Sequence, residues 1–481
     1  MTRPQKKRRG DSAFLLLKTA GDSIILLFIQ SFETLVKKWK ENAFSGRTEE
    51  TDVKKWIRGG RVIDPSCGRD EICDLLIDGG VIAAVGGDFS AEGAEEVIDA
   101  AGLVVAPGLV DMHTHMREPG FEKKETIATG TAAAARGGVT TLLAMANTLP
   151  VIDSPERVGE LYRRAEQDAK VRLYTVAAVS RGMQGKEITD VEELLAAGAA
   201  ALSDDGVPLM NAAIMREALI RMKPSGLPIL SHSEDGDLVR AGVMNEGALS
   251  RKLGYQGRPA VAEELLLVRD GMLAADVDGS VHICHVSTKG SVCYIRMMKE
   301  AGVKITAETC PQYFTITEEE IEKQGAMAKV NPPLRRQADV EAILEGLKDG
   351  TLDCIVTDHA PHTAEEKSRP LPNTPSGMVG LETSLALSLT VLHHQQGLPL
   401  SFVIEKMSTA PAKILKLDAG TLRPGAPADL VLFDPDERWV VDPEQFASKG
   451  RNTPFAGWEL QGRVHRTLVG GETVYDGSAV R

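Results

Sequence analysis

The sequence predicts an α/β fold, a (β/α)8 TIM barrel with a small β-rich domain formed from segments before and after the barrel. Eight short apolar runs lie within residues 109–358, and helical patterns occupy most of the intervals between them. Continuous apolar runs that alternate with helices indicate parallel strands buried on both faces. Eight such units over about 250 residues are the size of a (β/α)8 barrel. Short alternating segments with Gly-Gly and Asp-Pro turns lie on both sides of this region, which indicates antiparallel strands and hairpins.

The predicted strands and helices follow one another in the order that a barrel requires. The strands are expected at Leu109–His115, Val139–Ala144, Val171–Val179, Ala199–Ser203, Leu227–His232, Val281–Val286, Val303–Glu308 and Asp353–Asp358. Helices are expected between them, among others at Glu122–Arg136, Pro155–Lys170, Ala260–Ala275 and Thr288–Lys299. A doubly wound open sheet is the alternative, but no GxGxxG or P-loop motif follows any of these strands.

Three parts of the chain differ in composition and pattern. We expect residues 107–417 to form the barrel, and residues 56–106 together with 418–481 to form the small β-rich domain. The strands of the small domain are predicted from the alternating segments Trp56–Val62, Asp74–Val85, Asp429–Phe433 and Val464–Val474. Residues 1–55 form a separate N-terminal extension, basic and apolar, whose role the sequence does not indicate.

The N-terminal extension has a charge opposite to that of the remaining chain. It carries 12 Lys and Arg against 7 Asp and Glu, whereas the rest carries 43 against 61. Its apolar stretch, Ala13–Val36, contains Lys18 and Asp22, which make a membrane-spanning helix costly. It also has no clear signal-peptide cleavage site. We expect a solvated extension, and the alternative is contact of residues 1–40 with an anionic membrane surface.

The overall composition argues against several classes of protein. The net charge of −13 and an aromatic content of 4% argue against binding to nucleic acid, which needs cationic and stacking surfaces. The six cysteines show neither a CxxC motif nor the spacing of a disulfide framework. In a chain of this size they indicate reduced thiols, and we expect a cytoplasmic protein.

Metal-type ligands occur where five of the predicted barrel strands end. His113 and His115 are two residues apart, a spacing that places both imidazoles on one face of a strand. The other strand ends carry His232, His285, Asp358 and the pair Asp204 and Asp205. Barrel enzymes place their catalytic groups at the C-terminal ends of the strands, so we expect these side chains to meet.

Four imidazoles and two carboxylates exceed the ligand set of one tetrahedral zinc ion. They suit two divalent ions that share a bridging carboxylate and a bridging water. Such a pair generates hydroxide near neutral pH and polarises a carbonyl oxygen. The sequence therefore predicts hydrolysis of an amide-like bond, with one aspartate moving protons.

Four segments carry a specific combination of motifs, namely Asp111–Gly120, Ser203–Gly206, Val330–Arg335 and Thr357–His362. Together they resemble the bacterial type I dihydroorotases, a branch of the cyclic amidohydrolases. The resemblance runs from about Trp56 to the C-terminus, including Gly420–Asp429, and leaves residues 1–55 uncovered. It implies a (β/α)8 barrel with a small β-rich domain built from both chain ends.

The resemblance also implies a zinc site, with two Zn2+ ions per subunit. The first ion would be held by His113, His115 and Asp358, the second by His232 and His285, with Asp205 bridging them. Asp204 is the competing candidate for the bridge. In hydantoinases, dihydropyrimidinases and allantoinases a carboxylated lysine bridges the metals instead. Residues 196–210 contain no lysine, which favours the aspartate-bridged branch.

The substrate implied by the resemblance is L-dihydroorotate, a ring amide with a carboxylate. Arg117, Asn147 and His362 would hold the carboxylate and the ring, and Asn331 would contact the polar edge of the ring. The spacing of Arg117 from His115 would place it on the strand face of the ligands. Asp358 would take a proton from the attacking hydroxide and deliver it to the leaving nitrogen, giving N-carbamoyl-L-aspartate. The reverse reaction, ring closure, is the step that pyrimidine biosynthesis uses.

Two other functions compete with a working dihydroorotase. One is a catalytically silent homologue that serves as a scaffold for aspartate transcarbamoylase, although every metal-ligand position is retained here. The other is a different cyclic-amide hydrolase of the hydantoinase or allantoinase kind, against which Arg117 and the missing lysine argue. We expect a homo-oligomer, and an aspartate transcarbamoylase is a further candidate partner.

Overall fold

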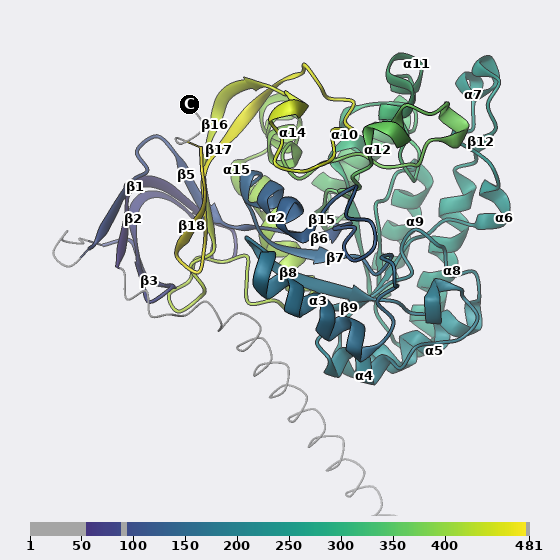
Figure 1. Cartoon of the computed structure of the whole chain (residues 1–481), viewed down its shortest axis with the longest axis horizontal. Helices are drawn as coiled ribbons and strands as arrows, with labels where there is room; N and C mark the ends of the chain where they lie inside the picture. Colours follow the sequence, from purple (N-terminus) through teal and green to yellow (C-terminus); the bar gives the residue numbers. More distant parts are fainter. Residues whose placement is uncertain (1–53, 88–93, 478–481) are drawn as a thin grey trace, which may run out of the picture. The chain divides into compact units, whose positions relative to one another are not determined.

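The computed structural model describes residues 54–87 and 94–477 (Figure 1). Its centre is a parallel sheet with the order β15-β14-β13-β10-β9-β8-β7-β6. These strands are β6 (Leu109–Thr114), β7 (Val139–Ala144), β8 (Arg172–Ala177), β9 (Ala201–Leu202), β10 (Ile229–Ser231), β13 (Val281–Ile283), β14 (Ile305–Thr309) and β15 (Cys354–Ile355). Each of the eight lies within or overlaps a predicted strand, so the predicted (β/α)8 barrel is confirmed.

The barrel closes between its first and last strands by contacts just beyond their ends. Thr114 and His359 form an isolated parallel bridge, and the backbone N–H of His115 donates to the His359 carbonyl at 2.8 Å. On the same seam the hydroxyl of Thr357 donates to Asp111 Oδ2 at 2.6 Å. Burial raises the pKa of the Asp111 carboxyl to about 7, against the hydrogen bonds from Thr357 and His113. This closure brings the segment after β15 next to the end of β6.

Helices surround the barrel, and several of them begin at a capping side chain. Thr126 accepts a hydrogen bond from Thr129 N at the start of α2, and Thr288 accepts one from Ser291 N at the start of α9. The longer helices are α2 (Ile127–Arg136), α3 (Pro155–Asp168), α5 (Ala212–Met222), α8 (Val261–Val277), α9 (Lys289–Glu300) and α12 (Gln337–Lys348). Shorter ones are α4 (Val191–Ala196), α6 (Gly236–Val239), α7 (Ala248–Leu253), α10 (Pro311–Thr315), α11 (Glu320–Gln324), α13 (Ala364–Lys367), α14 (Ser384–Ser388), α15 (Leu400–Ile404) and α16 (Ala410–Ile414).

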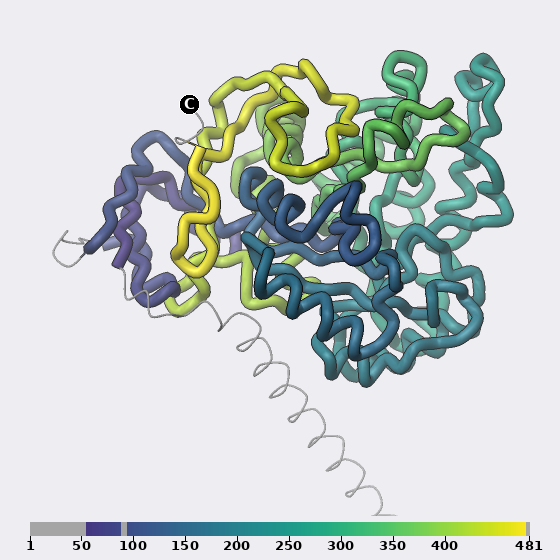
Figure 2. The backbone as a smooth tube through the Cα atoms, in the orientation of Figure 1, coloured from purple at the N-terminus to yellow at the C-terminus, as the bar shows by residue number. Residues whose placement is uncertain are grey.

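Segments from both ends of the described chain form a second sheet, drawn in purple and yellow in Figure 2. Its order is β18-β17-β16-β5-β1-β2-β3, and β4 pairs with β1. Its strands are β1 (Lys55–Asp64), β2 (Arg69–Asp78), β3 (Val81–Val85), β4 (Glu96–Asp99), β5 (Val104–Pro107), β16 (Leu430–Val440), β17 (Glu459–Val469) and β18 (Glu472–Asp476). The expected β-rich layer is therefore present. One difference is that β1 pairs in parallel with β4 and β5, whereas only antiparallel strands were expected.

A buried ion pair joins the second sheet to the barrel. Arg172 at the start of β8 contacts both carboxylate oxygens of Asp429, with Nη2 at 3.0 Å from Oδ1. Asp429 directly precedes β16, and its Oδ1 also accepts a hydrogen bond of 2.7 Å from Gly470 N. One carboxylate thus ties β8 to two strands of the sheet.

Asp429→Ala is expected to lower the free energy of unfolding by roughly 3–5 kcal/mol, because it removes the buried carboxylate that the largely buried Arg172 guanidinium contacts. Chemical denaturation followed by circular dichroism measures this loss. Asp276→Ala is the matched control, since Asp276 and its partner Arg216 are exposed and such pairs contribute at most about 1 kcal/mol. Equal losses in the two variants would contradict the role given to this junction.

The expected N-terminal extension lies almost entirely outside the described residues, as do residues 1–40, for which membrane contact was the alternative. Among the residues that are described, no helix has the length and apolar character needed to cross a membrane. The six cysteines are all within the described ranges and are free thiols.

Candidate metal centre

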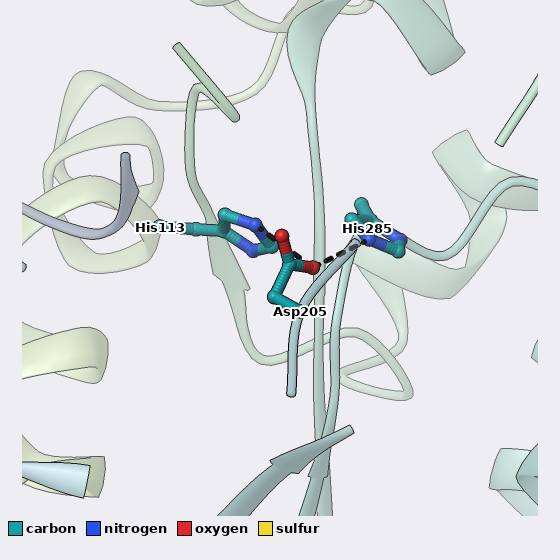
Figure 3. A group of neighbouring side chains, drawn as sticks. All are labelled: His113, Asp205 and His285. Atoms are coloured by element: carbon teal, nitrogen blue, oxygen red, sulfur yellow. Dashed lines mark ion pairs between the residues drawn. The ribbon is translucent and has the colours of Figure 1, made fainter. Parts of the chain in front are cut away.

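The six predicted ligands meet at the C-terminal end of the barrel. Asp205 lies at their centre, because its Oδ1 is 3.1 Å from His232 Nδ1 and 3.4 Å from both His113 Nε2 and His285 Nε2. Its Oδ2 is 3.4 Å from His115 Nε2. Figure 3 shows His113, Asp205 and His285 pointing toward one another from separate strand ends.

Asp358 completes the group on the side of β6. Its Oδ1 lies 3.0 Å from His115 Nε2 and 3.7 Å from His113 Nε2. Two residues of the cluster, His285 and Asp358, adopt positive φ angles of 38° and 48°. Such conformations are uncommon outside glycine and persist where surrounding contacts hold them, often at functional sites. The chain thus departs from regular strand geometry where these side chains turn into the cluster.

The two aspartates after β9 face different ways. The Asp204 carboxylate accepts hydrogen bonds from the backbone N–H of Ser180, at 3.0 Å, and from its hydroxyl. It therefore faces the loop after β8, whereas Asp205 faces the imidazoles. This geometry favours Asp205 over Asp204 as a ligand.

The hydrogen bonds at Nδ1 of two imidazoles indicate what their other nitrogen, Nε2, presents to the cluster. His113 Nδ1 lies 2.6 Å from Glu308 Oε1, and His115 Nδ1 lies 3.0 Å from Asn147 Oδ1. Both oxygens are acceptors, so each Nδ1 carries a proton. In the neutral form of either ring, Nε2 then has a lone pair directed at the cluster. His113 Nε2 is buried and has no hydrogen-bond partner among the described residues. A lone pair facing anionic oxygens requires positive charge between them, either a second proton on the ring or a metal ion.

The electrostatics of the cluster agree with that requirement. Burial opposes ionisation of Asp205, but His113 and hydrogen bonds from three histidines outweigh it and hold its pKa well below the usual range. Burial also opposes a charge on His113, yet Asp205 and Glu308 raise its pKa well above the usual value. The pKa of His232 is raised to about 9 by Asp205 and Glu234, again against burial. Divalent cations would supply the charge that protons supply in their absence.

The donor atoms fit a metal centre. One group consists of His113, His115 and Asp358, and another of His113, Asp205 and His285, each with its donor atoms within 4.8 Å of one another. Imidazole and carboxylate donors in this number suit zinc and related divalent ions. The overlap of the two groups at His113 agrees with adjacent metal positions around Asp205.

A cavity of about 210 Å³ opens beside the cluster. The candidate metal ligands His115, Asp205, His232, His285 and Asp358 line it, together with the predicted substrate residues Arg117, Asn147, Asn331 and His362. Arg258, Ser376 and Gly377 also line it, and of the described residues that do so none is a lysine. All four predicted substrate residues thus share one cavity with the candidate metal ligands.

Arg117 reaches the cavity by a different route from the one predicted. β6 ends at Thr114, and Arg117 has a φ of 63°, so it is not the continuation of a strand face. A left-handed turn directs its side chain inward, where Nε donates to the Pro361 carbonyl at 3.2 Å. Burial lowers its pKa to about 10 although Asp358 opposes this, so the guanidinium remains charged at neutral pH.

His362 lies beside Arg117. Its Nε2 donates to the Ser376 carbonyl at 2.9 Å, and burial and Arg117 together lower its pKa to about 3, so the ring is neutral. Gly377 has a φ of 134°, and a Cβ there would come within 3.1 Å of His362 Nε2 and 2.9 Å of the Ala360 carbonyl oxygen. The close approach of this loop to His362 therefore requires glycine.

Three charged residues at the site were missed by the sequence analysis. Glu308 at the end of β14 contacts His113 and also His282, whose Nε2 lies 3.1 Å from Glu308 Oε2. Glu234 lies close to His232, and Arg258, which pairs with Glu234, lines the cavity. Glu308 is the last residue of a predicted strand, as several candidate ligands are, and this position is the only feature of the sequence that points to it. Glu234 follows β10 and Arg258 ends the two-residue strand Gly257–Arg258, and no local pattern reveals that they pair.

Comparisons with known proteins agree with this geometry. A protein-family model described as dihydro-orotase-like matches residues 102–291. The chain is 47% identical to a dihydroorotase of Geobacter metallireducens over 87% of its own length and 99% of the relative. It is 48% identical to a dihydroorotase of Pelotomaculum thermopropionicum over 89% of its length and all of the relative.

Solved structures of related enzymes share the fold. A dihydropyrimidinase from Brevibacillus agri is similar with a TM-score of 0.78 and 28% identity, covering 88% of this chain and 95% of that one. An L-hydantoinase from Arthrobacter aurescens gives 0.79 and 26%, covering 88% and 96%. The identity to curated relatives over nearly their whole length decides between these related groups. The chain belongs to the dihydroorotase family of cyclic amidohydrolases.

Proposed function

We propose that this chain is a working dihydroorotase, which interconverts L-dihydroorotate and N-carbamoyl-L-aspartate. The observation that carries the proposal is one cavity lined both by the His and Asp cluster and by the charged guanidinium of Arg117. A ring amide with a carboxylate needs a centre that activates water and a fixed cation that recognises its charge. The retention of all six ligand positions argues against a silent scaffold.

The metal centre is proposed to hold two zinc ions. His113, His115 and Asp358 would hold the first, His232 and His285 the second, and Asp205 would bridge them. When bound, such ions supply Lewis-acid activation of the scissile carbonyl and an activated water. The lone pairs that His113 and His115 direct at the carboxylates support this assignment.

Asp358 is proposed to carry the proton. It lines the cavity and contacts the cluster through Oδ1, so its carboxylate can accept a proton from the attacking water. The same carboxylate can then protonate the leaving ring nitrogen, which completes hydrolysis of the amide. In the reverse direction it removes the proton from the ureido nitrogen as the ring closes.

Substrate recognition is proposed to depend on the wall around Arg117. Arg117 supplies the charge for the carboxylate, with His362 beside it, and Asn147 and Asn331 supply amide groups for the ring. Asn147 also donates from Nδ2 to the Asp205 carbonyl at 3.3 Å, which fixes its orientation. Hydantoins and dihydropyrimidines lack the carboxylate, so they would gain nothing from this cation.

Arg117→Gln is expected to lower kcat/KM for L-dihydroorotate by about 100-fold or more, because the charged pair with the carboxylate is lost. Hydrolysis of dihydrouracil, which has the ring without the carboxylate, should change little. Steady-state rates with both compounds measure this preference, and Arg117→Lys, which keeps the charge without the planar fork, should be intermediate. A wild type that prefers dihydrouracil would instead support a hydantoinase-like enzyme.

We also propose a cytoplasmic homo-oligomer, with an aspartate transcarbamoylase as a possible further partner. The six free thiols support the location. Exposed apolar side chains along α8, namely Val261, Leu265 and Met272, support an interface, because solvent-facing helix surfaces are normally polar.

A further inference from the structure

Arg258 and Glu234 form a largely buried ion pair beside His232 and Asn331, and Arg258 lines the cavity. Arg258 Nη1 lies 3.1 and 3.2 Å from the two Glu234 oxygens, and the side chains are 15% and 8% exposed. Arg258 Nε donates to the Gly242 carbonyl at 2.6 Å. The Gly242 carbonyl thus holds the guanidinium through Nε, and the guanidinium in turn holds the Glu234 carboxylate through Nη1.

This pair determines how Asn331 is oriented. Arg258 Nη1 also contacts Asn331 Oδ1, and because arginine can only donate, the amide oxygen must face it. Asn331 Nδ2 then faces the other side, where it donates to Glu234 Oε2 at 3.0 Å. Both ends of the amide are thus set by the same two charged residues.

The pair also reaches His232. His232 Nδ1 faces Asp205, so a metal there would take the lone pair of Nδ1 and leave the proton on Nε2. That proton needs an acceptor. The nearest groups are Asn331 Nδ2, at 3.3 Å, and Glu234 Oε2, at 3.6 Å. Arg258 has fixed Nδ2 as a donor, so Asn331 cannot accept this proton. The Glu234 carboxylate, in ion-pair contact with the ring and just outside hydrogen-bond distance, is the acceptor that faces Nε2.

The wall that carries Arg258 is anchored to the barrel by a second arginine. Arg335 Nη1 donates to the Arg258 carbonyl at 3.1 Å and to Asn245 Oδ1 at 2.9 Å, and its Nε donates to Ser287 Oγ at 3.1 Å. Asn245 and Arg258 lie in β11 (Met244–Asn245) and β12 (Gly257–Arg258), two short strands paired in parallel. The Arg258 backbone is therefore held independently of its side-chain contacts.

We propose that Glu234 and Arg258 are positioning residues that serve the metal centre and the substrate wall together. Glu234 accepts the Nε2 proton of His232 and so orients that ligand toward the metal. Arg258 holds Glu234 in place, balances the charge of its carboxylate and determines the orientation of the Asn331 side-chain amide. This inference rests on the proposed function only for the role of Asn331, and the metal-binding part stands without it.

Zinc affinity tests the proposal without relying on activity. Metal-free Glu234→Gln and Arg258→Gln proteins are titrated with zinc against a fluorescent chelator, beside the wild type. One of the two sites is expected to weaken on the order of 10- to 100-fold in both variants, the usual effect of losing such a partner. Glu246→Gln and Arg251→Gln are the matched controls, because both residues are exposed and lie in the same region of the chain. These controls should bind zinc as the wild type does.

Arg258→Lys keeps the positive charge and separates positioning from folding. It should recover part of the lost zinc affinity, and its KM for N-carbamoyl-L-aspartate should rise more than its kcat falls. Wild-type zinc affinity at both sites in folded Glu234→Gln protein would overturn the proposal. So would equal weakening of both sites in every variant that keeps its circular dichroism spectrum. A wild type without dihydroorotase activity, together with selective zinc loss in Glu234→Gln, would refute the function and leave the positioning role supported.

Discussion

Asp358→Asn is expected to lower kcat by about 10²- to 10⁴-fold in both directions, with KM changed much less. The substitution preserves the size of the side chain but removes the carboxylate that takes and returns the proton. Steady-state kinetics of ring opening and ring closure measure the effect. Because the equilibrium constant cannot change, kcat/KM must fall by the same factor in each direction.

Metal content must be measured in the same protein, since Asp358 is also a candidate ligand. An Asp358→Asn enzyme that keeps both metals and loses its activity supports the proton-transfer role. Asp349→Asn is the control, because Asp349 is exposed at the end of α12 and should leave the rates unchanged. Rates close to wild type in Asp358→Asn with both metals bound would contradict the assignment.

Removal of metal by a chelator is expected to abolish activity, and zinc should restore it. The metal-free protein should also melt at a lower temperature, because a ligand that binds only the folded state stabilises it. Its stability should depend on pH in a defined direction. The pKa of His232 is raised in the folded protein to about 9, so its contribution is present below about pH 6.5 and is lost as the pH rises toward 9.

The metal-loaded protein should lack this pH dependence between about 6.5 and 9, since the metal replaces the proton on the imidazole. Thermal melts of both forms at several pH values measure the difference. A metal-free protein that is equally active, or that melts at the same temperature as the loaded one, would contradict the proposed centre.

The barrel and the six clustered side chains could be predicted from the sequence because both follow from local pattern and strand direction. Parallel barrel strands end at one face, so residues such as His232 and His285, which follow different strands, must approach each other. The resemblance implied Asp205 as the bridging residue, but the residues alone left Asp204 as a competing candidate. Both follow β9, and which one faces the cluster depends on the distant hydrogen bonds from Ser180.

The contacts of Arg258 and Glu234 could not be predicted either, because they too depend on residues that are distant in the sequence. Arg258 and Glu234 lie 24 residues apart in the segment between β10 and α8, and only the folded structure places them against each other and against Asn331. The parallel pairing of β1 with β4 likewise depends on a long-range crossover rather than on alternation of side chains. For Arg117 the predicted neighbourhood is correct and the predicted reason is wrong, because a positive φ directs the side chain inward.

The most direct test is an assay of the purified, zinc-loaded chain with L-dihydroorotate and with N-carbamoyl-L-aspartate. We expect interconversion in both directions, with rates that vanish on chelation and return with zinc. Absence of turnover in either direction, in protein shown to hold two metals and tested with and without an aspartate transcarbamoylase, would contradict it.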